Sequence, residues 1–214
     1  MQEIINLSRN IYLCGEIDEE TSKEVVQNLL EIESFDEENE GLIKDYEREP
    51  IIVYISTRGG YIEEALSIYD TIRMLSTPVV TVVLGFAYSA GLIISLAGDI
   101  RIISENGNIM YHQISYGDAD THMTMQRRIN RCEIRHKDIQ KIITTRSDLT
   151  LEKLKEYDER NEDLYFSAKE AVEVGICHMI QESCDVIDGE DFVKALKEVG
   201  GLVEKENNEE YDDI

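Results

Sequence analysis

Positive charge is scarce in this sequence. Its 214 residues include 21 lysines and arginines against 45 aspartates and glutamates, which gives a formal net charge of -24. Such a chain repels phosphate backbones and anionic lipid surfaces unless a local basic patch prevails. We therefore expect neither nucleic acid nor a membrane surface as a partner.

Paired cysteines and a leader segment are also missing. The four cysteines show no C-x-x-C spacing, which argues against a zinc site. No secretory signal, with its basic, apolar and small-residue regions, opens the chain. These two absences predict a reduced, cytoplasmic location.

One uncharged stretch, residues 74–98, is long enough to cross a bilayer. Its composition argues against a membrane span, because serine, threonine, proline and glycine interrupt it. Gly85 divides it into a β-branched half and a half rich in small residues. A buried parallel strand followed by a buried helix fits that division better.

What the sequence does contain is an alternation of apolar strands and helical patterns. The run IIVYIS at 51–56 has the composition of a strand buried on both faces. After Gly59 and Gly60 the apolar residues follow helical spacing as far as Leu75. With 42% hydrophobic residues, this alternation predicts one α/β domain over residues 1–203.

Three further segments stand out by composition. From about 120 to 146, apolar residues recur at mainly three- and four-residue spacing, which predicts one long helix that projects or packs as an arm. Residues 34–50 are acidic and weakly periodic, so we expect a surface excursion there. The acidic residues 204–214 are expected to form a disordered tail.

Ser89 lies where the buried strand is expected to turn into the buried helix, in an A-x-S-x-G arrangement with Ala87 and Gly91. At a helix N-terminus, backbone N–H groups and the helix dipole can stabilise the anion of a tetrahedral intermediate. Small neighbours let a substrate carbonyl approach. Ser89 fits equally well as a serine N-cap in a close-packed turn. The sequence leaves both interpretations open.

Other groups that nucleophilic catalysis needs follow predicted strands. Gly59 and Gly60 provide bare backbone at the carboxyl end of a strand, where ligands collect in α/β folds, although such a pair is more often a simple turn. His112 ends the apolar run NIMYH, where backbone can hold it in place. It is therefore the histidine best suited to act as a general base.

The remaining candidates have ordinary explanations. His122 and His136 fall on the polar side of the expected long helix, where a solvated role is the usual one. His178 is expected on a strand. Asp163 precedes a capped helix, but in a chain with 45 acidic residues a solvated charge is the default.

Taken in order, these segments resemble the Clp protease proteolytic subunits, a family of self-compartmentalised serine peptidases, over about residues 11–180. VYISTRGGYIEEALSIYDTI resembles the family's strand, Gly-Gly turn and helix, and GFAYSAGLIISLAG resembles its nucleophile segment. NIMYHQ resembles its histidine strand, and EDLYFSAKEAVEVGI resembles the segment that carries its aspartate. The resemblance implies an α/β spiral of β-β-α units from which the long helix protrudes as a handle.

Residue by residue, the resemblance assigns Ser89 as the nucleophile, His112 as the base and Asp163 as the acid that orients the imidazole. The backbone N–H groups of Gly60 and Ala90 would form the oxyanion hole. The mechanism that follows is acyl transfer by a serine triad. It requires no metal and no organic cofactor.

The resemblance also implies assembly and partners. It implies homo-heptameric rings, stacked as a tetradecamer, which cleave unfolded polypeptides in an enclosed chamber, with a Clp-type AAA+ ATPase as a candidate partner. Between Arg127 and Arg146 the chain has seven basic and two acidic residues. A positive arm on a negative chain is expected to seek a neighbour's acidic surface.

The sequence departs from the family pattern at Arg58, where the family has proline, and at Ala90, where methionine is usual. Neither change removes a backbone donor. Only about ten residues precede the first expected strand, from which we expect a comparatively open axial pore. Two alternatives remain: a catalytically silent ring subunit of this fold, and a crotonase-type acyl-CoA enzyme, which needs no nucleophilic serine.

Overall fold

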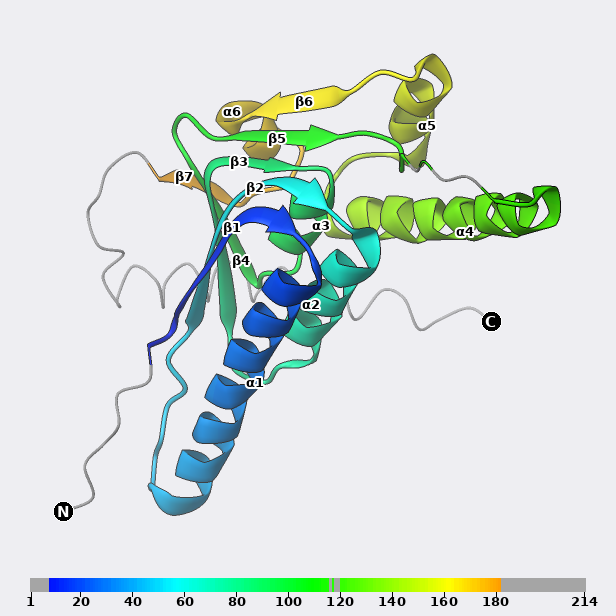
Figure 1. The fold of residues 1–214 in the computed structure, drawn as a ribbon. Coiled ribbons are helices and arrows are strands. Elements are labelled where there is room, and N and C mark those ends of the chain that lie inside the picture. The colour runs from blue at the N-terminus through cyan, green and yellow to red at the C-terminus, as the bar shows by residue number, and fades with distance from the viewer. Residues whose placement is uncertain (1–7, 116, 118–119, 182–214) are drawn as a thin grey trace, which may run out of the picture.

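Parallel strands form the centre of the protein (Figure 1). The computed structural model describes residues 8–115, 117 and 120–181, so the expected acidic tail at 204–214 lies outside the described residues. Each pair of neighbours along the central strand order is parallel. That order is β1 (Asn10–Ile17), β2 (Ile51–Gly60), β3 (Val79–Tyr88), β4 (Ile100–Ser104) and β7 (Met179–Gln181).

The expectation of strands buried on both faces holds for β3 and only in part for β2. The first five residues of β3 are all buried, as a β-branched run between two covered faces should be. Along the first seven residues of β2, buried and half-buried residues alternate. The uncharged stretch at 74–98 thus contains a buried strand and, after it, the short buried helix α3 (Ala90–Ser95), as predicted.

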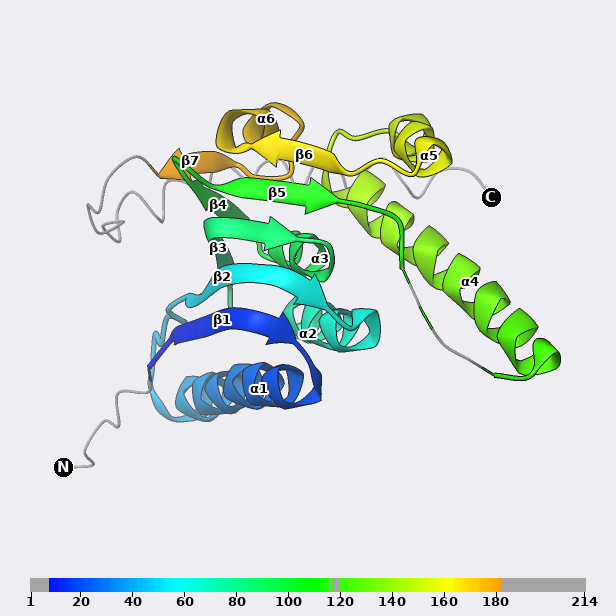
Figure 2. The ribbon, with the colours of Figure 1, turned by 45° about the horizontal axis from the view of Figure 1, so that its top comes forward.

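Three helices follow the first three strands and lie on the same side of the sheet (Figure 2). α1 (Glu19–Leu42) packs beside α2 (Ile62–Met74), and α2 packs beside α3. Residues Leu29, Ile68 and Ile94, one from each helix, are fully buried in the common core. The α/β class predicted from the sequence is confirmed.

The spiral turns at Gly85 of β3, which has a φ of 81°. β3 pairs with β2 both before and after that glycine, but its other neighbour changes: before Gly85 it pairs with β4, and after it Phe86–Tyr88 pairs with β5 (Asn108–Tyr111). β5 in turn pairs antiparallel with β6 (Leu164–Ser167). β3 therefore belongs to two layers of strands, and its last residues, which pair with β5, lead directly into Ser89.

The long helix expected over about 120–146 is α4 (His122–Arg146), and it projects from the body of the protein (Figures 1 and 2). Its buried residues, Ile139, Gln140 and Ile143, all lie in its C-terminal half. α5 (Leu151–Arg160) and α6 (Ala168–Glu173) follow. Within the parts of the chain given above, no helix combines the length and apolar character that a bilayer crossing requires.

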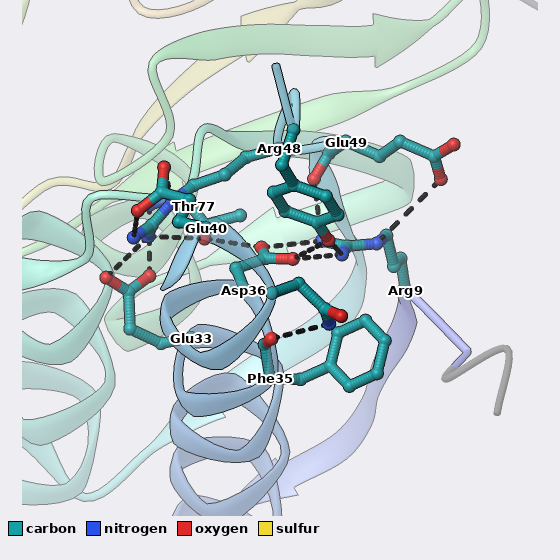
Figure 3. Close-up of polar contacts among 10 residues, drawn as sticks. Arg9, Glu33, Phe35, Asp36, Glu40, Arg48, Glu49 and Thr77 are labelled. Atoms are coloured by element: carbon teal, nitrogen blue, oxygen red, sulfur yellow. Dashed lines mark hydrogen bonds and ion pairs between the residues drawn. The ribbon is translucent and has the colours of Figure 1, made fainter. Parts of the chain in front are cut away.

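The first half of the acidic stretch 34–50 is not a surface excursion, contrary to expectation. α1 continues to Leu42, and Asp36 on it is fully buried. Its carboxylate accepts hydrogen bonds from both terminal nitrogens of the Arg9 guanidinium, and from the hydroxyls of Tyr46 and Thr77 at 2.7 Å each (Figure 3). Hydrophobic periodicity could not reveal this, because a buried carboxylate with matched donors looks like a solvated one in sequence.

A second arginine fastens the end of this stretch to α1. The Arg48 guanidinium donates to the carboxylates of Glu33 at 2.9 Å and Glu40 at 2.7 Å, and to the hydroxyl of Thr77 at 3.0 Å (Figure 3). Arg48 therefore ties residues 43–50 to the C-terminal half of α1 and to Thr77, just before β3, by charge-assisted hydrogen bonds.

Candidate active site

Ser89 occupies the junction between β3 and α3 in a strained backbone conformation. Its φ is 54° and its ψ is -118°, and its N–H donates to the carbonyl of Met110 at 2.9 Å. A non-glycine residue at such a positive φ costs on the order of 1–3 kcal/mol and persists only where its surroundings hold it. The Ser89 side chain makes no capping hydrogen bond to the helix. Ser89 therefore stands at the N-cap position, as one of the two interpretations predicts, but its hydroxyl does not cap the helix.

The Ser89 hydroxyl instead meets His112. The Oγ of Ser89 lies 2.7 Å from Nε2 of His112, a distance at which a nucleophile can pass its proton to a general base. The pairing of Tyr88 with Met110 places the ends of β3 and β5 side by side. Ser89 and His112, which follow these two ends, therefore lie next to each other. If Nε2 accepts this proton, Nδ1 carries the other and needs an acceptor of its own.

Asp163 lies near this pair without contacting the imidazole. Asp163 and His112 both line a cavity of about 410 Å³. The Asp163 carboxylate is exposed and accepts a hydrogen bond from the hydroxyl of Tyr165 at 3.3 Å, and no hydrogen bond joins these two described residues, Asp163 and His112. The structure thus brings the predicted serine and histidine into contact and does not join the predicted acid to the histidine.

Gly60 and Ala90, the predicted oxyanion donors, share a larger pocket of about 610 Å³ with Ser89 and His112. Ala90 is the first residue of α3, so its N–H has no acceptor within the helix. A Cβ on Gly60 would fall 2.2 Å from the carbonyl oxygen of Ile17. Only bare backbone fits at this edge of the pocket.

A polar cluster next to His112 could not be recognised from the sequence. His136, expected to be solvated, is half-buried, and its Nε2 lies 2.7 Å from the Asp158 carboxylate on α5. The same carboxylate accepts from the hydroxyl of Tyr111 at 3.0 Å and from the side-chain amide of Gln140 at 2.8 Å. Burial, together with the nearby Asp158 charge, raises the pKa of the Tyr111 phenol, which therefore stays a donor. Nothing in the sequence distinguishes Asp158 from the chain's other acids.

The cluster holds His112 from both sides along the chain. Tyr111 precedes His112, and Gln113 follows it with its side-chain amide donating to the carbonyl of Asp158 at 3.2 Å and to Oδ1 of Asn161 at 2.9 Å. Asn161 ends α5 in the left-handed conformation, with a φ of 53°. The position of the candidate base is thus coupled to α4 and α5.

The other histidines have structural surroundings. His178 lies just before β7, and its Nδ1 accepts a hydrogen bond from the backbone N–H of Arg101 at 3.1 Å. Burial lowers the pKa of His178 to about 3, so it is a neutral acceptor. His122 is exposed at the start of α4. Across residues 8–115, 117 and 120–181, no group of three or more His, Cys, Asp or Glu side chains could hold a metal ion.

Comparison with known proteins agrees with the geometry of the fold. The sequence model of the Clp protease family matches residues 1–183. The ATP-dependent Clp protease proteolytic subunit 2 of Treponema denticola is 30% identical over 185 residues, which are 86% of this chain and 86% of that protein. Subunit 1 of Streptomyces avermitilis is 31% identical over 183 residues, covering 84% of this chain and 78% of that one.

A solved structure gives the same result. A mutant of ClpP1 from Listeria monocytogenes matches with a TM-score of 0.70 and 25% identity, covering 83% of this chain and 93% of that chain. The spiral α/β fold with a protruding long helix, which the resemblance implied, is confirmed by this similarity.

Proposed function

Since this chain belongs to the Clp protease family, we propose that it is a serine endopeptidase that hydrolyses peptide bonds of unfolded polypeptides with Ser89, His112 and Asp163. The single observation that carries the proposal is the 2.7 Å contact between Ser89 Oγ and His112 Nε2. It is made by a serine whose backbone is strained and whose hydroxyl does not cap the helix that follows.

The proposed reaction proceeds in two halves. His112 Nε2 takes the hydroxyl proton as Ser89 Oγ attacks the substrate carbonyl, and the oxyanion is stabilised by the N–H groups of Gly60 and Ala90. His112 then gives the proton to the leaving amine, and an acyl-enzyme remains. A water molecule, activated by the same imidazole, attacks the acyl group and releases it from Ser89.

Asp163 is proposed to accept the Nδ1 proton of His112 and to stabilise the imidazolium. Its carboxylate lines the same cavity as His112 and is exposed, and we propose that it turns from the Tyr165 hydroxyl toward the ring. Ordering of this rotation by substrate or by a neighbouring subunit would complete the triad.

Two alternatives explain less. A catalytically silent subunit would have no reason to keep a strained serine in contact with a histidine, given the free energy that such strain costs. A crotonase-type enzyme would use the backbone donors alone and leave the contact between Ser89 and His112 without a role.

We further propose that the chain forms heptameric rings that stack as a tetradecamer, and that a Clp-type AAA+ ATPase delivers folded substrates to it. Two of the relatives described above are proteolytic subunits of ATP-dependent Clp proteases. Projection of α4 away from the body leaves most of that helix available for contact with another subunit (Figure 2).

The test is digestion of an unstructured, casein-like protein and of a stably folded one. The wild-type protein should degrade the first, and Ser89→Ala should degrade neither. Ser115→Ala is a matched control, because Ser115 lines the same pocket and has no assigned role. Degradation by Ser89→Ala, or loss of degradation in Ser115→Ala as complete as in Ser89→Ala, would refute the assignment.

A further inference from the structure

One wall of the pocket beside Ser89 is cationic. Arg128, Arg131 and Arg135 line it from α4, and their spacing of three and four residues puts them on one face of that helix. Glu63 is the only acidic residue among the described residues that line the pocket. In a chain of net charge -24, the described residues that line this cavity thus have an excess of two positive charges.

The three arginines differ in what already neutralises them. Arg128 lies 3.2 Å from the carboxylate of Asp120, and Arg135 lies 3.3 Å from that of Asp138 and 3.8 Å from that of Glu63. For Arg131, the described part of the chain supplies no hydrogen bond and no ion pair. Of the three arginines, Arg131 is therefore the one that no described carboxylate pairs with.

Four isoleucines give the pocket an apolar wall as well. The isoleucines lining it, from α2, α3, the segment after β5, and α4, are Ile62, Ile93, Ile114 and Ile139. A side chain that enters from a carbonyl bound at Ser89 would lie with its stem against isoleucine and its end near the arginines. A guanidinium and a carboxylate form charge-assisted, often bidentate hydrogen bonds, whereas an ammonium would be repelled.

We propose that Arg131, supported by Arg128 and Arg135, selects substrates with a glutamate as the residue whose carbonyl Ser89 attacks. A glutamate side chain matches both parts of the pocket: its two-carbon stem can pack against the isoleucines, and its carboxylate can pair with the arginines. This inference rests on the proposed peptidase function, and it names the substrate preference of the same site.

The basic residues of α4 do not all face away from the chain's own body. Of the seven basic residues on this helix, three line the chain's own pocket, and Arg146 donates to the carbonyls of Leu96 at 3.1 Å and Gly98 at 2.9 Å. The three that are exposed and do not line that pocket are Arg127, Lys137 and Lys141. Only three of the seven basic residues that were expected to contact a neighbouring subunit are therefore exposed outside the pocket.

The test uses four peptides that are identical except for glutamate, glutamine, leucine or lysine at the selected position. Cleavage by the wild-type protein is measured as kcat/KM, and binding of the uncleaved peptides is measured by calorimetry on Ser89→Ala. Glutamate should exceed its isostere glutamine by roughly fivefold in both assays, the size expected for one partly exposed ion pair. Lysine should be the poorest of the four.

Arg131→Gln should remove the preference for glutamate over glutamine while cleavage of the leucine peptide persists. Arg127→Gln is the matched control, because Arg127 is on the same helix, is exposed and does not line the pocket. It should keep the wild-type preference. The mass of each variant, measured by light scattering, shows whether Arg131 serves a subunit contact instead.

Three results would overturn the inference while leaving the peptidase proposal intact. They are equal cleavage of the glutamate and glutamine peptides by the wild-type protein, an equal loss of preference in Arg127→Gln, and loss of assembled mass in Arg131→Gln alone. If no peptide is cleaved by the wild-type protein, the peptidase proposal fails instead. In that case calorimetry on Ser89→Ala still tests the preference for glutamate. Equal affinity for the glutamate and glutamine peptides would refute carboxylate recognition.

Discussion

Gly59 and Ser89 approach so closely that a Cβ added to Gly59 would lie 2.9 Å from the Cβ of Ser89. The same atom would lie 2.9 Å from the carbonyl oxygen of Tyr88, and Gly59 itself has a φ of 104°. The end of β2 therefore supports the turn that presents the nucleophile, and it can do so only as glycine.

Gly59→Ala should consequently damage the site more than the fold. The positive φ should lower the free energy of unfolding by about 1–3 kcal/mol. The contact with Ser89 should reduce peptidase activity at least about tenfold, because small displacements of a reacting group are costly to rate. Gly15→Ala is the control, since Gly15 has a φ of 94° and open space around a Cβ. If both variants lose activity equally, crowding at Ser89 is not the cause.

The Asp158 cluster should stabilise the fold and position His112. Asp158→Asn replaces an acceptor of three side-chain donors with an amide that presents donors of its own, so we expect a loss of about 2 kcal/mol in unfolding free energy. The rate of Ser89 acylation should fall severalfold at a temperature where the variant is fully folded. Glu159→Gln, an exposed neighbour on α5, should change neither quantity. An acylation rate for Asp158→Asn equal to that of Glu159→Gln would remove the positioning role.

Acid should remove the stabilisation that Asp36 provides. Burial alone would raise the pKa of this carboxyl, but the hydrogen bonds from Arg9, Tyr46 and Thr77 together hold its pKa below the usual value. A carboxyl whose pKa is lower in the folded state stabilises the fold above its unfolded pKa, about 4, and this contribution is lost as pH falls through the folded value. Unfolding free energy is measured against pH for the wild type and Asp36→Asn.

At pH 7, Asp36→Asn should be less stable than the wild type by about 3 kcal/mol, because Arg9 loses its buried partner. The difference should shrink below about pH 4. Acid also reduces the net negative charge of both proteins and so weakens charge repulsion in both. The difference in stability between them is free of this effect. Glu37→Gln, an exposed neighbour, should follow the wild type throughout. A difference between wild type and Asp36→Asn that does not change with pH would contradict the account.

The parts of the site that could be predicted are those fixed by local sequence. Ser89 is marked by the change from β-branched to small residues around Gly85, and His112 by the end of an apolar strand. Parallel pairing of β3 with β5 then brings these two local features together. The fold class follows from the same alternation of strand and helix patterns.

The parts that could not be predicted depend on partners far away in the chain. Asp158 and Asp36 are two among 45 acidic residues, and each is selected by donors at least ten residues distant. His136 looked solvated because helical periodicity identifies the apolar face and does not identify an acceptor on another helix. A buried polar side chain is recognised only once its hydrogen-bond partners are placed.

Ring assembly should depend on salt. Each chain brings a formal charge of -24 to the proposed particle, so repulsion between subunits must be screened. We expect dissociation at low ionic strength, near 10 mM, where the Debye length is about 30 Å, and assembly near 150 mM, where it is about 8 Å. Light scattering across this range measures the mass, and a monomer at every salt concentration would refute the ring.

Labelling with a fluorophosphonate probe tests the central claim most directly, because the probe reacts only with a serine that a neighbouring base has activated. Mass spectrometry of the digested protein should find a label on Ser89, and the label should be absent in Ser89→Ala and in His112→Ala, since a nucleophile and its base act as a unit. Ser115→Ala should label as the wild type does. A wild-type protein that takes up no label at Ser89, or a His112→Ala variant that labels at the wild-type rate, would contradict the assignment of this serine and histidine as the catalytic pair.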